Sequence, residues 1–462
     1  MKEDLRNTKE KGHKVEEQSL RFFLDKLEDN EHLLFNIQRE DYLLSAIVYE
    51  LESKGKFPIV EFRHPSTGER TIANVFANRD TIKKCIFNIV DTEEKIEEFN
   101  QLDVEDDGPV QELIFKGEDL NILDLPIYKH FPGDAGRYIT SGIVIAKDPD
   151  TGRHNFSFHR MQLKDRNKMG ISLHSRGDLW RYYNRSKELN KNLEIAVVIG
   201  THPAYYITGA TKIPQNYDDY SWASTYMNQN AKVVKGKTVD IYVPAQAEYV
   251  IEGYISVDEL EDEGPFAEYT GYGTDHSTRN VFYVTCITKR EDAIYQDLVP
   301  GFAWEHLLLS QFTKEIILLD KLKKEIPEVM GLSMPKNGCH FHAYMAIDPK
   351  AEGQVKQAMM LLFGLDPYLK LIIAVNSDID IYDEEEVIWS MATRMQADRD
   401  VFIVPKVICN SLDPSSINGM SAKMGIDATK ALDWKATKIR LPEDLLEEAR
   451  KMLDGEKNFG IH

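Results

Sequence analysis

A series of short apolar runs between residues 110 and 300 restricts the fold most strongly. Several of these runs alternate apolar and polar residues or are rich in β-branched residues, which is typical of strands. Turn residues separate them, as in Asp-Pro-Asp-Thr-Gly at 148–152. The pattern predicts a mixed or barrel-like sheet in this part of the chain. The runs are ITSGIVIAKDPDTG (139–152), LEIAVVIGTHP (193–203), TVDIYVPAQAEYVIEGYISV (238–257) and NVFYVTCITKRED (280–292).

The segment before this region has the pattern of a smaller α/β unit. Leu20, Phe23, Leu24 and Leu27 are spaced as on one face of a helix. The segment FPIVEFRHP then predicts a strand that ends at Pro65. An acidic stretch at 92–108 follows, and we expect it to close this first unit.

A long helix and a second α/β pattern follow the central region. An apolar stripe runs through EHLLLSQFTKEIILLDKLKKEIP, and Pro327 ends the helical pattern. The alternating segment HFHAYMAI, the helical segment VKQAMMLLFG and the apolar segment LIIAV come next. This order of strand, helix and strand predicts an α/β unit, and LPEDLLEEARKMLD predicts a final amphipathic helix. The stripe consists of Leu308, Phe312, Ile316, Leu319, Leu322 and Ile326.

Composition excludes several classes of partner. The 462 residues carry a net charge of −20, which disfavours binding to nucleic acid or to an anionic membrane. No run of 18 apolar residues predicts a membrane span, and the charged N-terminus has no apolar core of a secretory signal. The four cysteines form no CxxC pair, so we interpret them as reduced thiols of a cytoplasmic protein. They are Cys85, Cys286, Cys339 and Cys409.

The segment HNFSFHRMQ (154–162) holds candidate polar ligands. On a strand, Asn155, Ser157 and His159 face one side and Arg160 the other, so a local bend is needed to bring Asn155 and Arg160 into one site. An Asn with a nearby His and a carboxylate can ligate a hard divalent ion. His174 and Asp219 are candidates for the other two ligands. Because His and Asp are common in loops, the spacing alone does not establish a metal site.

The segment EDEGPFAEYTGY (261–272) places Glu263 and Glu268 on both sides of a Gly-Pro-Phe turn. Arg160 beside these acids would form a Glu–Arg–Glu trio. One carboxylate would hold the guanidinium through two hydrogen bonds, and the other could keep a pKa suited to proton transfer. An ordinary salt bridge between strands, or a solvated acidic loop, is the competing interpretation.

These residues resemble those of the UbiD-type decarboxylases, which use prenylated flavin mononucleotide (prenylated FMN). The matching segments follow one another in the family's order from about 136 to 430. They are GRYITSG (136–142), NFSFHR (155–160), the isolated His174, Asp218 and Asp219, VPAQAEYVIEG (243–253), EGPFAEYTGY (263–272), DIDIYDEEEVIWSMATR (378–394) and GIDATK (425–430).

The resemblance implies an α+β multidomain fold. Its parts are an N-terminal α/β domain at 1–112, a central split β-barrel of flavin-reductase type at 113–304, a linker helix at 305–327 and a C-terminal α/β domain at 328–462. The central barrel would bind prenylated FMN. The C-terminal domain would help to form a homo-oligomer, either a dimer or a hexamer. It also implies a flavin prenyltransferase as the partner that supplies the cofactor.

The resemblance also implies roles for individual residues. Asn155, His174 and Asp219 would bind Mn²⁺ or Mg²⁺ next to the flavin phosphate, with K⁺ beside it. Glu263 would orient Arg160, and Glu268 would protonate the carbon that loses carbon dioxide. The residues implied in cofactor binding are Asn155, Ser157, Phe158, His159, Arg160, Leu173, His174, Lys212 and Asp219.

The chain departs from the family pattern at two points. The third metal ligand is usually Glu, and Asp219 is one methylene shorter, so its backbone must approach the metal; Asp218 is the fallback. No residue matches the family's basic phosphate contact clearly, and Lys212 and Lys370 are candidates by position.

The implied activity is the non-oxidative, reversible decarboxylation of an unsaturated or (hydroxy)aromatic acid through a covalent adduct with prenylated FMN. The segment LVPGFAWEHLLL resembles the corresponding segment of family members that act on hydroxylated aromatic acids. In such a site His306, which follows Glu305, would form a hydrogen bond with a ring hydroxyl of the substrate. The alternative for both residues is the start of the linker helix, where acids are favoured. The alternative functions are a subunit of a carboxylase complex that fixes carbon dioxide, or a flavin-binding protein without decarboxylase activity.

Other polar and aromatic residues are interpreted as structural. Asp378 and Asp380 precede a helix whose acidic first turn stabilises the helix dipole. We expect Phe266 to pack the Gly-Pro-Phe turn, and Trp180, Tyr182 and Tyr183 to pack as well.

Overall fold

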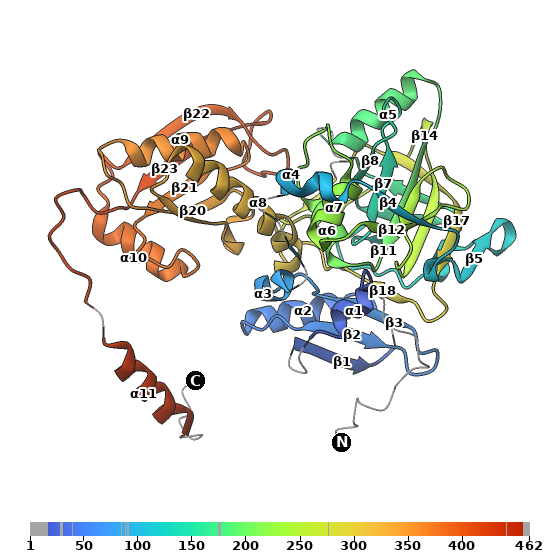
Figure 1. Ribbon diagram of the computed structural model, residues 1–462, viewed down its shortest axis with the longest axis horizontal. Helices are drawn as coiled ribbons and strands as arrows, with labels where there is room; N and C mark the ends of the chain where they lie inside the picture. The colour runs from blue at the N-terminus through green and yellow to red at the C-terminus, as the bar shows by residue number, and fades with distance from the viewer. Residues whose placement is uncertain are drawn as a thin grey trace.

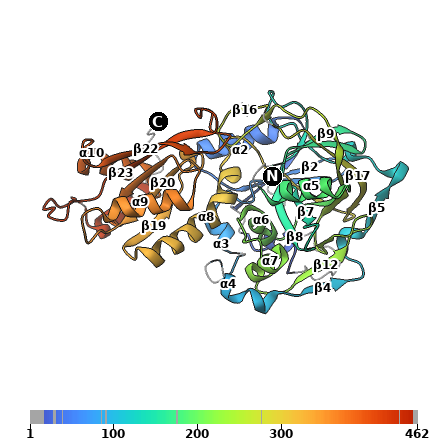
Figure 2. The same cartoon turned by 90° about the horizontal axis from the view of Figure 1, so that it is seen from above.

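The computed structural model describes residues 17–27, 31–38, 40–84, 86–87, 89, 92–173, 177–275, 277–439 and 441–455. They form two lobes (Figure 1). The larger lobe holds the N-terminal unit and the central sheet, and the smaller lobe is the C-terminal unit. Figure 2 shows the two lobes side by side, with helix α8 between them. The fold is a mixed α/β fold of several units, as expected.

The N-terminal unit is a four-stranded sheet covered by helices. Its strand order is β1-β2-β3-β18, so a segment that follows the central sheet in the chain completes the N-terminal one. Helix α2 buries Leu44 and Val48, four residues apart, against Val60 and Phe62 of β2. The elements are α1 (Leu20–Leu24), β1 (His32–Asn36), α2 (Leu43–Ser53), β2 (Ile59–Arg63), β3 (Arg70–Ala73), α3 (Arg79–Lys83) and β18 (Ile294–Gln296).

The central unit is built on a nine-stranded sheet. Its strand order is β6-β9-β10-β17-β14-β11-β7-β8, and β5 also pairs with β17. Only residues 159 and 160 join β8 to β9, although these strands lie near opposite ends of the order. The sheet therefore curls until its two ends approach each other, but no closed barrel is formed among the described strands. The strands are β5 (Leu113–Lys116), β6 (Tyr138–Ile139), β7 (Ile143–Lys147), β8 (His154–Phe158), β9 (Met161–Asp165), β10 (Lys168–Ile171), β11 (Leu193–Ile199), β14 (Tyr249–Leu260) and β17 (Asn280–Lys289).

Helices and two small sheets surround the central sheet. Helices α6 and α7 pack against β8 and against each other, and their buried faces share one core with β7 and β8. The remaining elements are α4 (Thr92–Lys95), the 3₁₀ turns at Ile96–Phe99, Pro109–Gln111, Gly117–Asp119 and Ile122–Asp124, α5 (Asp178–Glu188), α6 (Pro203–Ala210), α7 (Asp219–Met227), the sheet β13-β12-β4 (Tyr242–Pro244, Ala231–Lys235, Leu102–Glu105) and the ribbon β15-β16 (Phe266–Ala267, Gly273–Thr274).

Helix α8 (Trp304–Glu325) leads into the C-terminal unit and ends two residues before Pro327. The five-stranded sheet of this unit has the order β19-β20-β21-β23-β22. Helices α8 and α9 share a core with one face of the sheet, and α10 packs on the other face. Figure 1 shows α11 (Glu443–Gly455) apart from both lobes at the end of an extended segment. The other elements are β19 (Val329–Ser333), a 3₁₀ turn (Lys336–Gly338), β20 (His342–Ile347), α9 (Gln354–Leu365), β21 (Leu371–Val375), α10 (Glu384–Arg394), β22 (Val401–Ile408) and β23 (Met420–Asp427).

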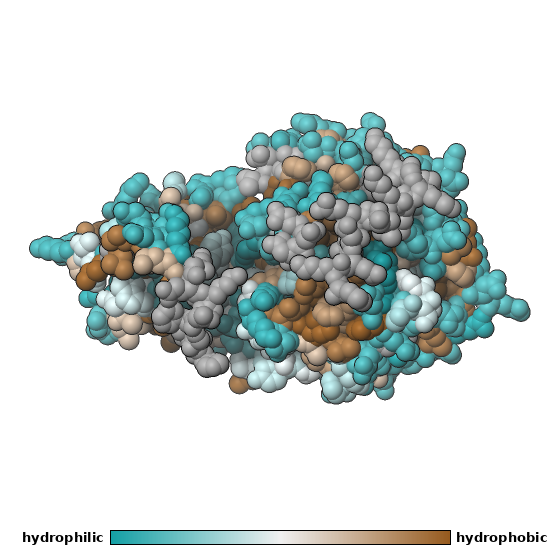
Figure 3. Space-filling view, turned by 90° about the horizontal axis from the view of Figure 1, so that it is seen from below, coloured by the Kyte–Doolittle hydropathy of each residue, from teal (hydrophilic) through white to brown (hydrophobic). Residues whose placement is uncertain are grey.

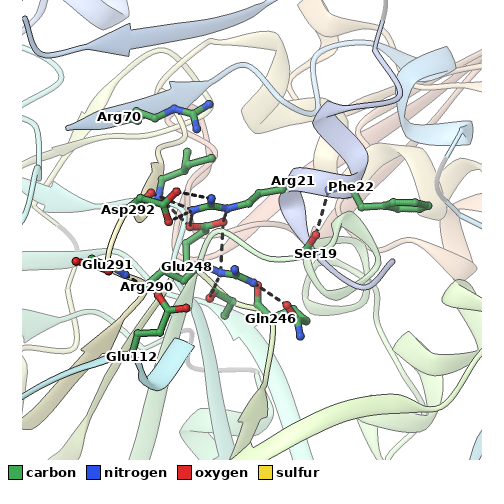
Figure 4. Close-up of polar contacts among 12 residues, drawn as sticks. Ser19, Arg21, Phe22, Arg70, Glu112, Gln246, Glu248, Arg290, Glu291 and Asp292 are labelled. Carbon is green, nitrogen blue, oxygen red and sulfur yellow. Dashed lines mark hydrogen bonds and ion pairs between the residues drawn. The ribbon is translucent and has the colours of Figure 1, made fainter. Parts of the chain in front are cut away.

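A buried ion network fastens α1 to the central sheet (Figure 4). The Arg21 guanidinium donates two hydrogen bonds to Glu248, from Nε at 2.8 Å and from Nη2 at 2.9 Å, and it also bonds the carboxylate of Asp292. The Glu248 side chain is fully buried and also accepts a hydrogen bond from the backbone of Ile294 in β18. Three parts of the chain that are far apart in sequence are therefore joined at one carboxylate.

Figure 3 shows the underside of the larger lobe, where hydrophilic side chains form the rim and apolar side chains gather in one patch. Within the described residues, no helix is both long and apolar enough to cross a membrane.

Candidate active site

The connection between β8 and β9 places Arg160 at the point where the two ends of the central sheet approach each other. Strand β8 ends at Phe158 and β9 begins at Met161, so His159 and Arg160 form the predicted bend. The Arg160 side chain is 8 % exposed and points at the Glu263–Glu268 segment.

Arg160 bonds both acids. Its Nε and Nη2 atoms each lie 3.0 Å from one oxygen of Glu263, which is a bidentate pair. Its Nη1 atom lies 2.6 Å from Oε1 of Glu268. The Glu263 side chain is fully buried, whereas 14 % of the Glu268 side chain is exposed. The two acids therefore differ: one holds the guanidinium, and the other keeps access to the space beside it.

The electrostatics of the trio favour a charged Arg160. Burial by itself would lower the pKa of this guanidinium, but its hydrogen bonds and charge interactions with Glu263 and Glu268 raise the pKa instead. Two carboxylates around one permanent cation leave the ionised trio with a single net negative charge.

The turn between the acids is held by backbone contacts. Gly264 has φ = +100°, a conformation that glycine adopts without strain, and the Gly264–Pro265 peptide is cis. The Pro265 carbonyl accepts a hydrogen bond from Ala135 N at 2.8 Å. Phe266 is buried, its ring lies 4.7 Å from that of Tyr138, and the Arg160 guanidinium lies 5.0 Å from the Phe266 ring. Phe266 therefore packs the turn, as expected.

The side chains of Asn155 and Ser157 on β8 and of His159, just after the end of β8, form one row. Asn155 Nδ2 lies 3.3 Å from Ser157 Oγ, and His159 Nε2 lies 3.1 Å from the same oxygen. The other ring nitrogen of His159 bonds the carbonyl of Ser172. These three side chains are therefore linked through the Ser157 hydroxyl.

Asp219 begins α7 and reaches the backbone of β8. Its Oδ2 accepts a hydrogen bond from Phe156 N at 2.6 Å, beside Asn155. This hydrogen bond holds the first turn of α7 close to β8. Burial raises the pKa of Asp219 well above its usual value. Asp218 instead caps α7, since it accepts a hydrogen bond from Tyr220 N, and it also bonds His154.

The donors near Asn155 fit a divalent cation. The Asp219 carboxylate is deeply buried and accepts one backbone hydrogen bond. Among the described residues it has no cationic partner. A metal ion would supply the positive charge that a buried, ionised carboxylate requires. The amide of Asn155 adds an oxygen ligand of the type that Mg²⁺ and Mn²⁺ prefer. His174 lies outside the described residues, and the described residues contain no group of three His, Cys, Asp or Glu side chains that could hold a metal by itself.

The remaining predicted cofactor residues have mixed environments. Phe158 packs against Tyr206 of α6, with ring centroids 5.9 Å apart. Leu173 is buried, and its backbone N–H bonds Thr278. Lys212 is exposed between α6 and α7. Lys370 lies in the C-terminal unit, where it pairs with Asp413 at 2.8 Å.

Glu305 and His306 begin α8 but have different surroundings. Glu305 is fully buried, and its two oxygens accept hydrogen bonds from Asn74 N and Phe76 N, so it ties α8 to the N-terminal unit. Burial raises the pKa of Glu305 to about 8. His306 bonds the Gly301 carbonyl through Nδ1 at 3.1 Å. Burial lowers the pKa of His306, and the nearby Glu268 charge opposes this shift. His306 therefore belongs to the surroundings of the trio, whereas both Glu305 oxygens are committed to backbone contacts.

Two supporting groups were not recognised from the sequence. Asp134 Oδ1 accepts a hydrogen bond from Ala267 N at 2.9 Å, next to Glu268, and Asp134 Oδ2 bonds Phe131 N. His130 and Asp297 form a fully buried pair at 2.8 Å. Asp134 lies in a Pro-Gly-Asp turn just before GRYITSG, and this position is the one signal that could have identified it.

Two family models match the chain. The UbiD model, described as the 3-octaprenyl-4-hydroxybenzoate carboxy-lyase Rift-related domain, matches residues 102–303. The UbiD_C model, the C-terminal domain of the same carboxy-lyase, matches residues 307–428. Together they span well over half of the chain. The chain belongs to the UbiD family.

Solved UbiD structures share the whole architecture. HmfF from Pelotomaculum thermopropionicum in complex with FMN is 34 % identical with a TM-score of 0.87, and the match covers 94 % of this chain and 99 % of that one. An evolved dimeric form of HmfF in complex with prenylated FMN is 32 % identical, with a TM-score of 0.82 and coverage of 91 % and 97 %. The closed form of vanillic acid decarboxylase from Sedimentibacter hydroxybenzoicus is 25 % identical, with a TM-score of 0.78 and coverage of 96 % and 100 %.

A sequence relative adds an activity within the UbiD family. The anhydromevalonate phosphate decarboxylase of Methanothermobacter thermautotrophicus is 34 % identical over 314 residues, which are 68 % of this chain and 74 % of that protein. This chain is accordingly a carboxy-lyase of the UbiD type, and the two HmfF structures contain FMN or prenylated FMN.

Proposed function

We propose that this enzyme catalyses the reversible, non-oxidative decarboxylation of an unsaturated or (hydroxy)aromatic carboxylic acid with prenylated FMN. The observation that carries the proposal is the buried trio, in which Arg160 is bonded by Glu263 on two nitrogens and by Glu268 on the third. A flavin-binding protein without this chemistry would not require two acids around one arginine.

In this mechanism the side chains position the reactants and move one proton. Prenylated FMN, when present, would supply the electron sink that ordinary side chains lack. Glu263 holds the Arg160 guanidinium in one orientation. Glu268 delivers the proton to the carbon that has lost carbon dioxide, since its second oxygen makes no hydrogen bond with a described residue. The low exposure of all three side chains limits the contact of the trio with bulk water.

The phosphate end of the cofactor would be held through metal ions beside β8. Asn155, His174 and Asp219 are the proposed ligands of Mn²⁺ or Mg²⁺, with K⁺ nearby. The close approach of α7 to β8 supports Asp219 in this role. The curled central sheet is consistent with a split barrel of flavin-reductase type around the cofactor.

The substrate class follows from relatives with named activities and from His306. One relative acts on anhydromevalonate phosphate and another on vanillic acid. His306 donates Nδ1–H to the Gly301 carbonyl, so its Nε2 atom carries a lone pair that can accept a hydrogen bond from a substrate hydroxyl. We therefore propose an acid with a hydroxyl near the reacting end.

A homo-oligomer through the C-terminal unit is also proposed. Strand β22 lies at the edge of its sheet and exposes Ile403 and Ile408, and the neighbouring Ile417 and Met420 are exposed as well. An apolar edge strand of this kind is rarely left uncovered in a monomer.

The test is to produce the protein together with a flavin prenyltransferase and to measure the mass of the cofactor released on denaturation. Prenylated FMN in the released fraction, followed by carbon dioxide release from acids of an aromatic and unsaturated panel, is the expected result. A protein that holds prenylated FMN, Mn²⁺ and K⁺ but releases no carbon dioxide from any acid, and exchanges none into it, would contradict the proposal.

A further inference from the structure

The residue after Glu268 lies in a pocket of the C-terminal unit. Glu268 and Tyr269 follow each other at the end of β15, and Glu268 points at Arg160. Tyr269 instead packs edge-on against the ring of His340, with centroids 4.9 Å apart, and lies 6.2 Å from Phe341. Its hydroxyl accepts a hydrogen bond from Asn410 Nδ2. Figure 2 shows β16, the other strand of this ribbon, on the side of the larger lobe that faces the C-terminal lobe.

Contacts within the C-terminal unit and with α8 also support this pocket. His340, Phe341 and Asn410 are buried. Cys339 and His340 have φ values of +46° and +64°, a left-handed conformation that costs a residue other than glycine about 1–2 kcal/mol. His340 Nε2 lies 3.3 Å from Ser310 Oγ of α8, and the Phe341 carbonyl accepts hydrogen bonds from the backbone at 370 and 371. A strained segment held from two sides makes a rigid receptor for the tyrosine ring.

The turn that carries Glu268 has little support of its own. The β15-β16 ribbon consists of two residue pairs, Phe266 with Thr274 and Ala267 with Gly273. The turn is closed by Glu268 N to the Tyr272 carbonyl at 3.0 Å and by Gly271 N to the Glu268 carbonyl at 2.9 Å. A two-stranded ribbon of this length is marginal by itself. Towards the larger lobe, the segment is held by Asp134 at Ala267, by Phe266 on Tyr138 and by the Glu268–Arg160 ion pair. Towards the C-terminal unit, it is held by the ring and hydroxyl of Tyr269.

We propose that Tyr269 is a positioning residue: the C-terminal unit holds its ring, and the ring anchors the turn that carries Glu268 against Arg160. The inference rests on the proposed function, in which Glu268 delivers the proton. His340, Phe341 and Asn410 all belong to the C-terminal unit. The position of Glu268 would therefore depend on how this unit packs against the larger lobe. His306, whose ring lies 6.0 Å from that of Tyr269, joins the same contact from α8.

The test combines amide hydrogen exchange with kinetics on the protein loaded with prenylated FMN. Tyr269→Ala is expected to raise exchange at residues 268–272 at least about tenfold, since the turn then opens locally. The value of kcat is expected to fall about tenfold or more with a smaller change in KM, because a displaced acid affects the transfer step. Tyr269→Phe keeps the ring and should restore most of both properties. Tyr283→Ala, which removes a tyrosine on β17 that bonds Glu259, is the matched control.

Asn410→Ala removes one contact from the C-terminal side and leaves the loop sequence intact, so it tests the same anchoring if Tyr269→Ala does not fold. It is expected to raise exchange at 268–272 by a smaller factor. Unchanged exchange in both variants would overturn the inference, as would faster exchange with unchanged kcat. Amide hydrogen exchange can be measured without turnover. If the wild-type protein shows no turnover, the proposed function is rejected, and the exchange rates alone decide whether Tyr269 anchors the turn.

Discussion

Replacing each acid of the trio by its amide separates proton delivery from the holding of Arg160. Glu268→Gln keeps the size of the side chain and removes its titrating group. General acid catalysis contributes about 10²–10⁴-fold, so kcat is expected to fall by this factor, or by about 3–5 kcal/mol in activation free energy. Arg160 keeps both bonds to Glu263, so the free energy of unfolding should change by less than about 1 kcal/mol.

Glu263→Gln is expected to act differently. Two guanidinium N–H groups face the two oxygens of Glu263, whose side chain is fully buried. A Gln side chain offers one oxygen and one amino group, so one N–H of Arg160 would face another donor. Breaking one side of a buried ion pair costs about 3–5 kcal/mol, and we expect the lower end because Glu268 remains.

The assay is carbon dioxide release by protein loaded with prenylated FMN, with cofactor content measured in the same samples and stability measured by urea unfolding. Glu261→Gln is the control, because Glu261 lies in the same segment but pairs with Lys168 at 2.5 Å rather than with Arg160. Turnover of Glu268→Gln within about threefold of wild type would remove this residue from the acid role, since the loss expected is at least tenfold larger. Equal stability of the two variants would refute the argument from the bidentate pair.

Three further predictions concern stability and metal binding. Arg21→Ala leaves the buried Glu248 carboxylate without its bidentate partner and should lower the free energy of unfolding by about 3–5 kcal/mol in urea; a loss below about 1 kcal/mol would contradict it. Burial alone would raise the pKa of Asp378, but hydrogen bonds from two basic side chains lower it to about 2 from 3.8. Above pH 4, the free energy of unfolding of the wild type should therefore exceed that of Asp378→Asn by about 2 kcal/mol, and this difference should disappear between pH 4 and pH 2. A difference that does not change with pH would contradict the prediction. Asp219→Asn should lower bound Mn²⁺ or Mg²⁺ at least about tenfold by elemental analysis, and flavin retention with it; full metal occupancy would remove Asp219 from the ligand set.

The spacing of apolar residues predicted most of the helices and strands, because this spacing depends only on residues that are close together in the chain. The β-branched runs became β7, β11, β14 and β17, and the apolar stripe before Pro327 became α8. Acids in the first turn of α10 follow the cap at Asp383, as the helix dipole favours. Asp378, interpreted as structural, pairs with Arg394 and Lys430.

The candidate site was predicted in part, and the reason lies in sequence separation. The row of Asn155, Ser157 and His159 follows from the two-residue period of a strand, which is a local property. Arg160 and Glu263 are 103 residues apart, and no period connects them. Their meeting was expected from a family resemblance and not from spacing. Asp134 was missed because its role depends on a backbone N–H far along the chain.

Composition and pattern alone thus established an acidic protein with a β-rich centre, a long helix and an α/β end, because side-chain propensity and periodicity act over a few residues. Tertiary structure decided which acid lies on each side of Arg160, how α7 brings Asp219 to β8, and that β18 joins the N-terminal sheet. It also decided that Tyr269 leaves its own ribbon for the C-terminal unit. Such contacts depend on how the sheet curls and how the lobes dock, and these arrangements are set by the burial of surfaces contributed by distant segments.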